Sequence, residues 1–356
     1  MREENQLRMR IILVIAMVFA ANARAEDAKP TIVFLDKDAA SKAIVDDKNE
    51  PYFDTLQPIE MASKTGSPLT ATTLAEQRAE CRARYAKAAL AFTADEEALV
   101  RGVVEKIHPL IEADYPLYAK LPWTFLKLSN TIEGGFPFTR GDCIILPEDT
   151  LTQFTAQKAK DTAQKALVKA ARLLVHEQLH VFQRHHPDLV AKLYTDVWGF
   201  KRAAKIESCE WLDARHLANP DGLDCRWIFP IKDGDTTRYV WPLVIFDSAD
   251  KPQVMGPDIR MVAIDLEETG KDAYRVKLDD NKVPKYTDLM EVKPYLAQFE
   301  FWGEIFHPNE ISAEIFSTIF LIDSLLPKHD EAIPPGLGQQ TDLVRKFLRE
   351  NLKTGK

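Results

Sequence analysis

The segment that decides the fold is "LLVHEQLHVFQRHHPD", which covers Leu173–Asp188. It contains the pattern HExxH: His176 and His180 are four positions apart, and Glu177 follows the first histidine. Because residues four apart lie about 40° apart on one face of an α-helix, both imidazoles can bind one metal ion. Glu177 lies beside that face, where a carboxylate can accept a proton from a water molecule at the metal. The segment therefore predicts a buried helix that carries half of a zinc site, with Glu177 as the catalytic base.

A catalytic zinc site needs a third protein ligand, and the first candidate is His186. The letters HEQLHVFQRHH overlay the metzincin pattern HExxHxxGxxH, except that Gln183 replaces the glycine at which the chain must turn. Glutamine adopts a positive φ only at a steric cost. If the helix continues instead, His186 lies about 80° from His176 and about 120° from His180, and it points away from the metal. We therefore expect His186 and His185 to form a polar helix end, where an imidazole complements the helix dipole.

The second candidate lies in "HPNEISAEIF", residues 307–316. This segment resembles the third-ligand motif N-E-x-x-A of the gluzincin class of HExxH peptidases, and its E-x-x-A-E portion is similar to the corresponding helix of lethal-factor-type peptidases. The resemblance implies that Glu310 is the third ligand and that Glu314 orients His176 through the other ring nitrogen. Two carboxylates on one face of an otherwise apolar helix are costly unless they have partners. The alternative is that both glutamates form salt bridges at an exposed helix start.

Other residues are weaker candidates for roles in the same site. His216, His307 and Asp213 are possible substitutes for the third ligand, and His307, Tyr194 and Tyr295 are candidate donors to the oxyanion. The letters WTFLKLS (123–129) and CIILPE (143–148) predict two strands of a small sheet beside the metal helix. In gluzincins, an edge strand at this place binds extended peptide by strand addition.

The expected fold class is α+β and zincin-like: a mainly helical core, a small sheet beside the active-site helix, and a β-rich insert at about 226–290. We expect an N-terminal extension at 26–90, loosely folded over 26–75 and helical in composition at about 72–90. A metallopeptidase-like domain at 91–325 and a C-terminal tail with a helix at 326–356 are expected to follow. Helical patterns predict a helix that starts at a capping box of Thr93 and Glu96, and a long helical segment at about 157–185.

The first 25 residues have the pattern of a cleavable signal peptide. Arg8 and Arg10 precede a short apolar run, and Ala23 and Ala25 form an A-x-A site with expected cleavage after Ala25. The apolar run is about half of the ~20 residues that span a bilayer, so no stable membrane insertion is expected after cleavage; the alternative is an uncleaved anchor. The pattern indicates a secreted or periplasmic protein. A net charge of −8 without a basic stripe makes nucleic acid an improbable partner.

The four cysteines are expected to form disulfides in an exported chain. We favour the pair Cys209–Cys225, which closes a short loop, and hence Cys81–Cys143; the alternative is free buried thiols. No two cysteines form a CxxC pair, so a thiolate zinc site is not indicated.

The sequence thus predicts an exported zinc metallopeptidase, a hydrolase that acts on a peptide or protein substrate; the oligomeric state is left open. The alternative is a zinc-stabilised envelope binding or scaffold protein without turnover. An open fourth coordination position that faces a cleft would distinguish the peptidase from the scaffold, whose metal shell would be closed.

Overall fold

The chain is an α+β protein with two sheets, seen here in a computed structural model that describes residues 29–222, 224–299, 303–326 and 337–352. The predicted signal peptide lies outside these residues. The helices are α2 (Lys37–Ala43), α3 (Pro58–Lys64), α4 (Leu74–Lys87), α5 (Ala94–Asp114), α6 (Pro116–Ala119), α7 (Glu148–Lys160), α8 (Ala163–His185), α9 (Pro187–Lys192), α10 (Glu210–Asp213), α11 (Lys293–Phe299), α12 (Pro308–Phe320) and α13 (Leu337–Leu352). Short 3-10 or π turns are η1 (Glu133–Gly135), η2 (Leu193–Val197), η3 (Leu289–Glu291) and η4 (Leu321–Leu325).

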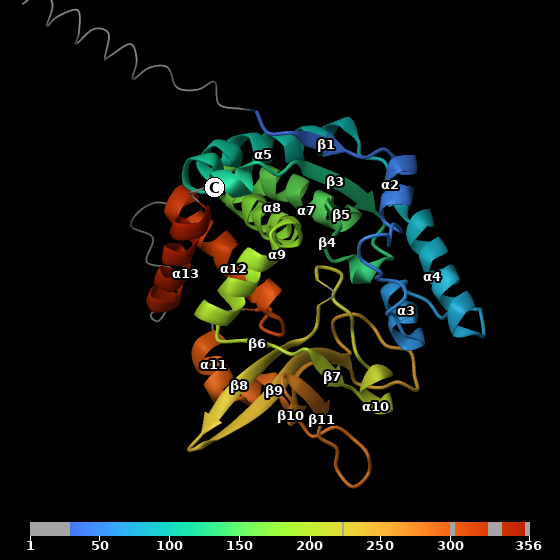
Figure 1. Cartoon of the computed structure of the whole chain (residues 1–356). Helices are drawn as coiled ribbons and strands as arrows, with labels where there is room; N and C mark the ends of the chain where they lie inside the picture. Colours follow the sequence, from blue (N-terminus) through green and yellow to red (C-terminus); the bar gives the residue numbers. More distant parts are fainter. Residues whose placement is uncertain (1–28, 223, 300–302, 327–336, 353–356) are drawn as a thin grey trace, which may run out of the picture.

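The smaller sheet has five strands: β1 (Ile32–Phe34), β2 (Ala89–Leu90), β3 (Trp123–Leu128), β4 (Phe138–Arg140) and β5 (Cys143–Pro147). Its order is β1–β3–β5–β4, and β2 pairs with β3. Strands β1, β3 and β5 are parallel, whereas β4 runs antiparallel to β5 and forms one edge. The two strands predicted at 123–129 and 143–148 are present, and helix α8 packs against β4 and β5 (Figure 1).

The larger sheet lies in the other half of the molecule (Figure 1). Its order is β6–β8–β9–β10–β11–β7, with β12 paired to β10, and its pairs are antiparallel except β7 with β11. Five of its strands fall in the region where the sequence predicts a β-rich insert. The seven strands are β6 (Lys201–Arg202), β7 (Lys205–Glu207), β8 (Trp227–Asp233), β9 (Thr236–Phe246), β10 (Ile259–Gly270), β11 (Ala273–Val276) and β12 (Tyr286–Asp288).

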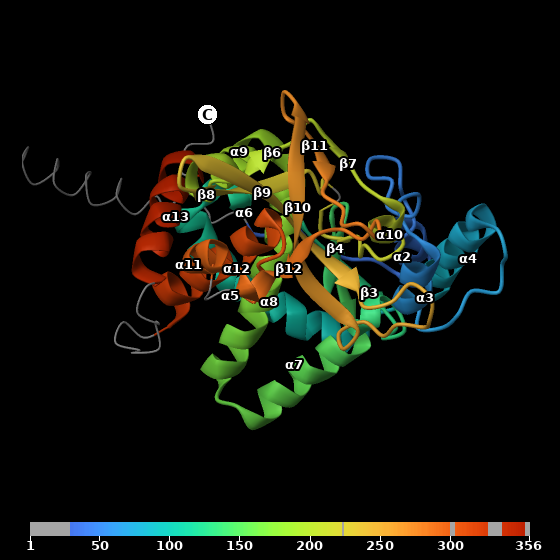
Figure 2. The same ribbon diagram turned by 90° about the horizontal axis from the view of Figure 1, so that it is seen from below.

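Helix α8 is the central element of the helical half. It starts after Thr162, whose side chain accepts from the amide of Lys165, so the single helical segment predicted at 157–185 is split into α7 and α8. The helix then runs without a break through Gln183 and ends at His186, just before Pro187, as the sequence predicts. Helix α12 packs alongside α8, while α7 and the start of α8 project from the body (Figure 2).

Residues 29–75 are not the loose extension that the sequence suggests, whereas the helix expected at about 72–90 is present as α4. Strands β1 and β2 belong to the smaller sheet, and α2, α3 and α4 enclose a hydrophobic cluster of their own with residues of β3, β4 and β5. Tyr52, Phe53 and Tyr85 are fully buried in this cluster. The segment is ordered because these aromatic side chains have a sheet to pack against, which the local sequence does not reveal.

The four cysteines are free thiols. Cys81 and Cys143 pack with one hydrophobic cluster, and Cys209 and Cys225 pack against another. Burial raises the pKa of Cys81 to about 12 and that of Cys143 to about 11, so as thiols both favour the protonated form near neutral pH. The expected pairings stay predictions, although the members of each pair share a cluster.

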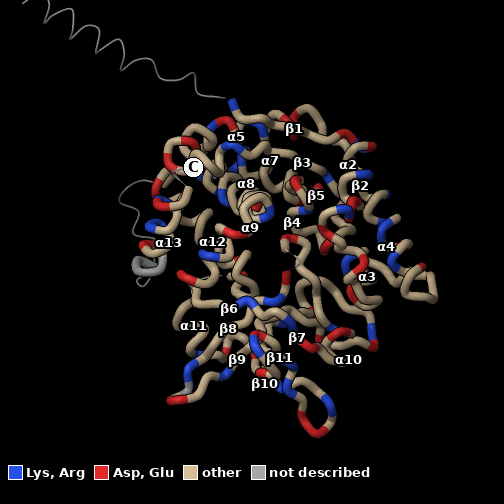
Figure 3. The backbone as a smooth tube through the Cα atoms, in the orientation of Figure 1, with Lys and Arg blue, Asp and Glu red and all other residues tan. Residues whose placement is uncertain are grey.

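Charged residues of both signs are interspersed along the chain (Figure 3). No helix within the described ranges is both long and apolar enough to cross a bilayer.

Candidate metal centre

Helix α8 presents two histidines to one point. The Nε2 atoms of His176 and His180 are 3.1 Å apart, because the residues are one helical turn apart on the same face. His180 is fully buried, and the side chain of His176 keeps 12 % of its surface exposed. The geometry thus places both imidazoles where they could bind one metal ion.

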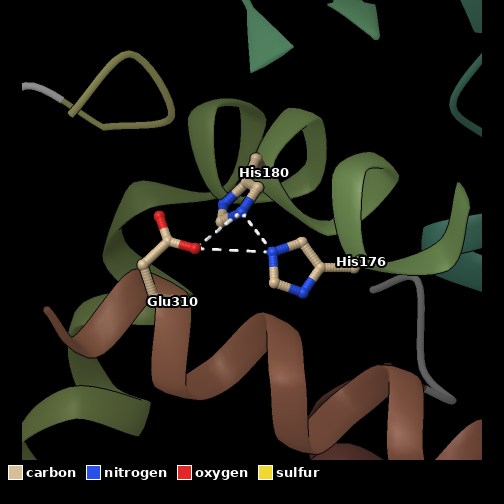
Figure 4. Close-up of side chains that lie close together, drawn as sticks. All are labelled: His176, His180 and Glu310. Carbon is tan, nitrogen blue, oxygen red and sulfur yellow. Dashed lines mark hydrogen bonds and ion pairs between the residues drawn. The ribbon is translucent and has the colours of Figure 1, made fainter. Parts of the chain in front are cut away.

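Helix α12 brings a carboxylate to the same point (Figure 4). Oε2 of Glu310 lies 3.4 Å from Nε2 of His176 and 3.3 Å from Nε2 of His180. A tetrahedral metal site with bonds of about 2.0–2.2 Å separates its ligand atoms by about 3.3–3.6 Å. The three atoms are close to that spacing, so His176, His180 and Glu310, which we call the metal centre, could hold a metal ion.

The electrostatics of the metal centre favour a bound cation. Two neutral Nε2 atoms and a carboxylate oxygen are all acceptors, and they repel one another unless a proton or a metal ion lies between them. Burial lowers the pKa of His180, but the charges of Glu310, Asp221 and Glu177 together outweigh burial and raise that pKa to about 10. Burial likewise opposes ionisation of Glu310, yet His180 and His176 together hold the pKa of Glu310 well below its usual range. The centre therefore attracts positive charge.

Gln183 orients one of the two histidines. Its Nε2 donates to the carbonyl oxygen of Asn309 over 3.0 Å, so its Oε1 faces Nδ1 of His180 at 2.9 Å. Nδ1 must then carry the proton, which leaves Nε2 of His180 free to bind a metal. Sequence analysis treated Gln183 only as an obstacle to a turn, and missed that one amide can hold a ligand and connect α8 to α12.

Glu177 is buried beside the metal centre. Its Oε2 accepts from Oγ1 of Thr139 on β4 over 2.9 Å. Burial raises the pKa of Glu177, and the nearby His176 and His180 partly oppose that shift. A buried carboxylate with a raised pKa beside a metal-binding point is suited to proton transfer.

A loop between α10 and β8, residues 217–221, crosses the site, and we call it the strap. Nδ2 of Asn219 donates to Oε1 of Glu310 over 2.5 Å, so the oxygen of Glu310 that does not face the histidines is also held. Asp221 lies within reach of both Glu177 and His180, a second grouping that could hold a metal ion. The letters ANPDG indicate a turn, and nothing in them indicates a role at the site.

The strap also covers the edge of β4. The amide of Thr139 donates to Oδ1 of Asp221 over 2.5 Å, and its carbonyl accepts from Nη2 of Arg184 over 3.2 Å. Pro137, two residues earlier on the same side of the strand, has no N–H to offer. Addition of a peptide strand at Thr139, as expected from the gluzincin resemblance, would therefore require the strap to leave.

Glu314 does not orient His176 as the resemblance implies. Its Oε2 accepts from Nη2 of Arg172 over 2.7 Å, and no hydrogen bond between Glu314 and His176 occurs in the described part of the chain. Arg172 lies one turn before His176 on α8, which places a cation nearer to Glu314 than the imidazole. Another carboxylate, Glu304, lies 4.0 Å from Nε2 of His176 on the more exposed side of the centre.

The two histidines at the end of α8 lie apart from the metal centre. The ring of His186 packs on that of Phe182 with centroids 4.4 Å apart, and Nε2 of His185 bonds Asp142 over 2.8 Å. Neither belongs to a group of described residues that could hold a metal ion.

Two of the candidate oxyanion donors are occupied by structural bonds. His307 is the N-cap of α12: its Nδ1 accepts from the amide of Asn309 over 3.2 Å, and its Nε2 donates to the carbonyl of Asp224 over 3.0 Å. The hydroxyl of Tyr295 donates to the carbonyl of Ile305. Both side chains therefore stabilise the surroundings of α12.

Tyr194 is the remaining candidate donor. Its ring packs edge-on against Trp227, and its pKa is raised by burial and then by the charge of Glu310. His216 and Asp213, the weaker candidate ligands, belong to no metal-capable group among the described residues. Burial lowers the pKa of His216 to about 4, so it stays neutral.

A cavity of about 510 Å³ opens at the metal centre. His176, Glu177 and Glu310 line it, together with all five strap residues. Its other walls combine apolar residues with charged ones. The apolar residues include Phe136, Leu173, Val244, Met255, Ile259 and Phe306, and the charged residues are Lys64, Glu133, Lys169, Arg172, Glu304 and Glu314. The arrangement gives a metal-binding point and a buried base access to a space large enough for a substrate side chain.

No protein-family model matches the chain, and neither does any curated protein or solved structure. The function must therefore be inferred from the residues of the site.

Proposed function

We propose that the protein is a zinc-dependent peptidase of the gluzincin type, with a zincin-like fold, that acts outside the cytoplasm after export. The observation that carries this proposal is the approach of three ligand atoms to within 3.4 Å of one another, beside a buried glutamate at the wall of a cavity. The N-terminal pattern of residues 1–25 supports export to the periplasm or the medium.

Zinc is the metal that this set of donors favours. Two imidazoles and one glutamate are a common ligand set of catalytic zinc sites, which leave a fourth position open. Zinc, when bound, would lower the pKa of a water molecule and polarise the substrate carbonyl. The bonds from Gln183 to His180 and from Asn219 to Glu310 would hold two of the three ligands in place.

Glu177 is the proposed base. It accepts a proton from the attacking water and then gives that proton to the leaving amine, so one carboxyl serves both steps of peptide hydrolysis. The hydrogen bond from Thr139 fixes the carboxylate of Glu177. The raised pKa of Glu177 brings its proton affinity closer to those of the water and the amine with which it exchanges the proton. The apolar walls of the cavity would hold a side chain of the peptide.

The alternative of an inactive zinc-stabilised scaffold is disfavoured by the cavity. A structural zinc site is closed by four protein ligands, whereas this centre borders a space of about 510 Å³. Asp221 is the residue that would close the shell if it moved onto the metal, because it lies near His180 and Glu177.

The test measures zinc content and peptide hydrolysis for the full chain and for Glu177→Gln, with a pool of internally quenched peptides as substrates. We expect one zinc per chain in both proteins and hydrolysis only by the wild type. Equal hydrolysis by both proteins would contradict the role of Glu177. Stoichiometric zinc without any hydrolysis would favour the scaffold.

A further inference from the structure

The strap is held by two side chains of α3, a helix that lies far away in the sequence. The amide of Ala218 donates to Oε1 of Glu60 over 2.7 Å, and its carbonyl accepts from Nζ of Lys64 over 2.9 Å. Both main-chain groups of the residue next to Asn219 are therefore bonded to charged side chains. Glu60 and Lys64 are 1 % and 0 % exposed, so water does not compete for these bonds.

Lys64 is itself fully bonded. Besides Ala218, its ammonium donates to Oε2 of Glu133 over 2.8 Å and to the hydroxyl of Tyr52 over 2.6 Å. An ammonium has three donors, and all three are used. Glu133 also accepts from Tyr52 and from Tyr85, and we call Glu60, Lys64, Glu133, Tyr52 and Tyr85 the lysine cluster.

Glu133 is held in an unfavourable backbone conformation. Its φ is 49°, in the left-handed region that residues other than glycine seldom adopt. Such conformations persist where the surroundings fix them, and they occur often near functional sites. Here the fixed carboxylate of Glu133 determines the position of the Lys64 ammonium, and this ammonium determines the position of the Ala218 carbonyl.

The chain of contacts ends at the metal centre. Next to Ala218, Asn219 bonds Glu310; two residues further on, Asp221 bonds the amide of Thr139, whose hydroxyl bonds Glu177. The strap thus touches both the third ligand and the support of the base. Lys64, Glu133 and the strap also line the same cavity as the metal centre.

Two interpretations of the strap are possible, and its anchoring distinguishes them. A cover that must leave to admit a substrate needs contacts that break easily. This strap is instead anchored by hydrogen bonds to two buried ionisable side chains, and leaving such a buried group without its partner is strongly unfavourable. The anchoring therefore indicates a permanent part of the site.

We infer that Glu60 and Lys64 are positioning residues of the metal centre, which act through Ala218 to set Asn219 against Glu310 and Asp221 against Thr139. The inference rests on the proposed function, because it supposes that the metal centre binds zinc. It assigns the N-terminal segment a part in the site, although none of its described residues bonds to His176, His180 or Glu310.

The test compares two variants that release the strap with two matched controls. Glu60→Leu removes the acceptor for Ala218 but leaves the pair Lys64–Glu133 intact, and Lys64→Met removes the donor. Glu60→Gln is the conservative control, because its amide oxygen can still accept from Ala218. Lys127→Met is the control for loss of a buried ammonium. Lys127 forms an ion pair of 2.8 Å with Glu96, and this pair does not involve the strap.

Three quantities are measured on each full-length protein: the zinc dissociation constant in competition with a chelator, the absorption spectrum with cobalt(II) in place of zinc, and thermal unfolding. We expect Glu60→Leu and Lys64→Met to weaken zinc binding on the order of tenfold and to change the cobalt spectrum, as altered outer-shell bonds do. Both controls should stay within about twofold of the wild type. A purely structural cluster would lower the unfolding temperature without changing the cobalt spectrum.

Several results would overturn the inference. One is a cooperatively folded Glu60→Leu protein with the zinc affinity and cobalt spectrum of the wild type. Another is faster peptide hydrolysis by Glu60→Leu at unchanged zinc affinity, which would make the strap a removable cover. If neither Glu60→Leu nor Lys64→Met folds, the lysine cluster has a purely structural role in the core. A wild-type chain that takes up no zinc would instead contradict the proposed function.

Discussion

The metal centre and the lysine cluster are two buried groups of charged side chains that differ in how their atoms match. In the lysine cluster, each of the three donors of Lys64 meets an acceptor. In the metal centre, two ring nitrogens and a carboxylate oxygen face one another within 3.4 Å, and none is obliged to be a donor. Donors that each meet an acceptor need no further partner, whereas several acceptors that face one another need a cation between them. The lysine cluster therefore fixes the strap, whereas the metal centre has the atoms to hold a cation.

The largest expected effect separates the chemistry from the metal. Glu177→Gln keeps the shape of the side chain and the bond from Thr139 but removes the base. We expect peptide hydrolysis to fall by about 10²–10⁴-fold, the usual contribution of a general base, while zinc content is unchanged. The measurement is kcat on a quenched peptide at equal zinc occupancy, and an unchanged kcat would contradict the assigned role.

The next effect sharpens the difference between the two clusters. Lys64→Met leaves buried carboxylates without their partner, and we expect the metal-free protein to lose about 3–5 kcal/mol of its free energy of unfolding. Glu310→Gln removes a ligand, so zinc affinity should fall more than the roughly 10–100-fold typical of outer-shell partners, with a smaller loss of metal-free stability. Urea unfolding and zinc titration of both variants test this pattern. The opposite pattern would mean that the two clusters have been assigned the wrong way round.

Zinc binding should release protons. The pKa of His180 is raised to about 10, so at pH 7 the metal-free centre holds a proton that zinc must displace. We expect release of about one proton per zinc, and hence an affinity that rises about tenfold per pH unit below pH 10. Calorimetry in buffers of different ionisation enthalpy measures the number released. A binding enthalpy that is independent of the buffer would show that the centre is not protonated.

The smallest effect concerns the orientation of one ligand. Gln183→Leu keeps the size of the side chain but removes both the bond to Nδ1 of His180 and the bond to α12. We expect zinc affinity to fall about tenfold and the cobalt spectrum to broaden, with hydrolysis per bound zinc little changed. Gln178→Leu, on the same helix and bonded to the carbonyl of Pro122, is the control. Equal losses in the two variants would attribute the effect to packing of α8.

The site could be predicted from the sequence where local periodicity determines geometry. The spacing of His176 and His180 places both on one face of a helix. Glu310 is singled out by the resemblance of its segment to the third-ligand motif of gluzincins, since the apolar helix alone does not distinguish it from Glu314. The role of Glu314 was misread because its nearest cation, Arg172, comes from another helix. Asn219 and Thr139 reach the site through long-range packing of a turn and an edge strand, which no local pattern encodes.

The fold shows the same division. Strands β3 and β5 of the smaller sheet and the capping box of Thr93 and Glu96 agree with the sequence, because strand alternation and helix caps are local signals. The order of the N-terminal segment depends on Tyr52 and Tyr85 meeting Glu133, which follows them by 81 and 48 positions. A contact of that range has no signature in the segment itself.

The most direct test of the account is the composition of the metal shell. The purified full chain is dialysed against a metal-free buffer, its zinc content is measured, and X-ray absorption at the zinc edge determines the ligands. We predict one zinc per chain, bound by two imidazoles and by oxygen ligands at about 2.0–2.2 Å, with no sulfur. Absence of retained zinc, or a shell with a third imidazole such as that of His186, would contradict the assignment of His176, His180 and Glu310.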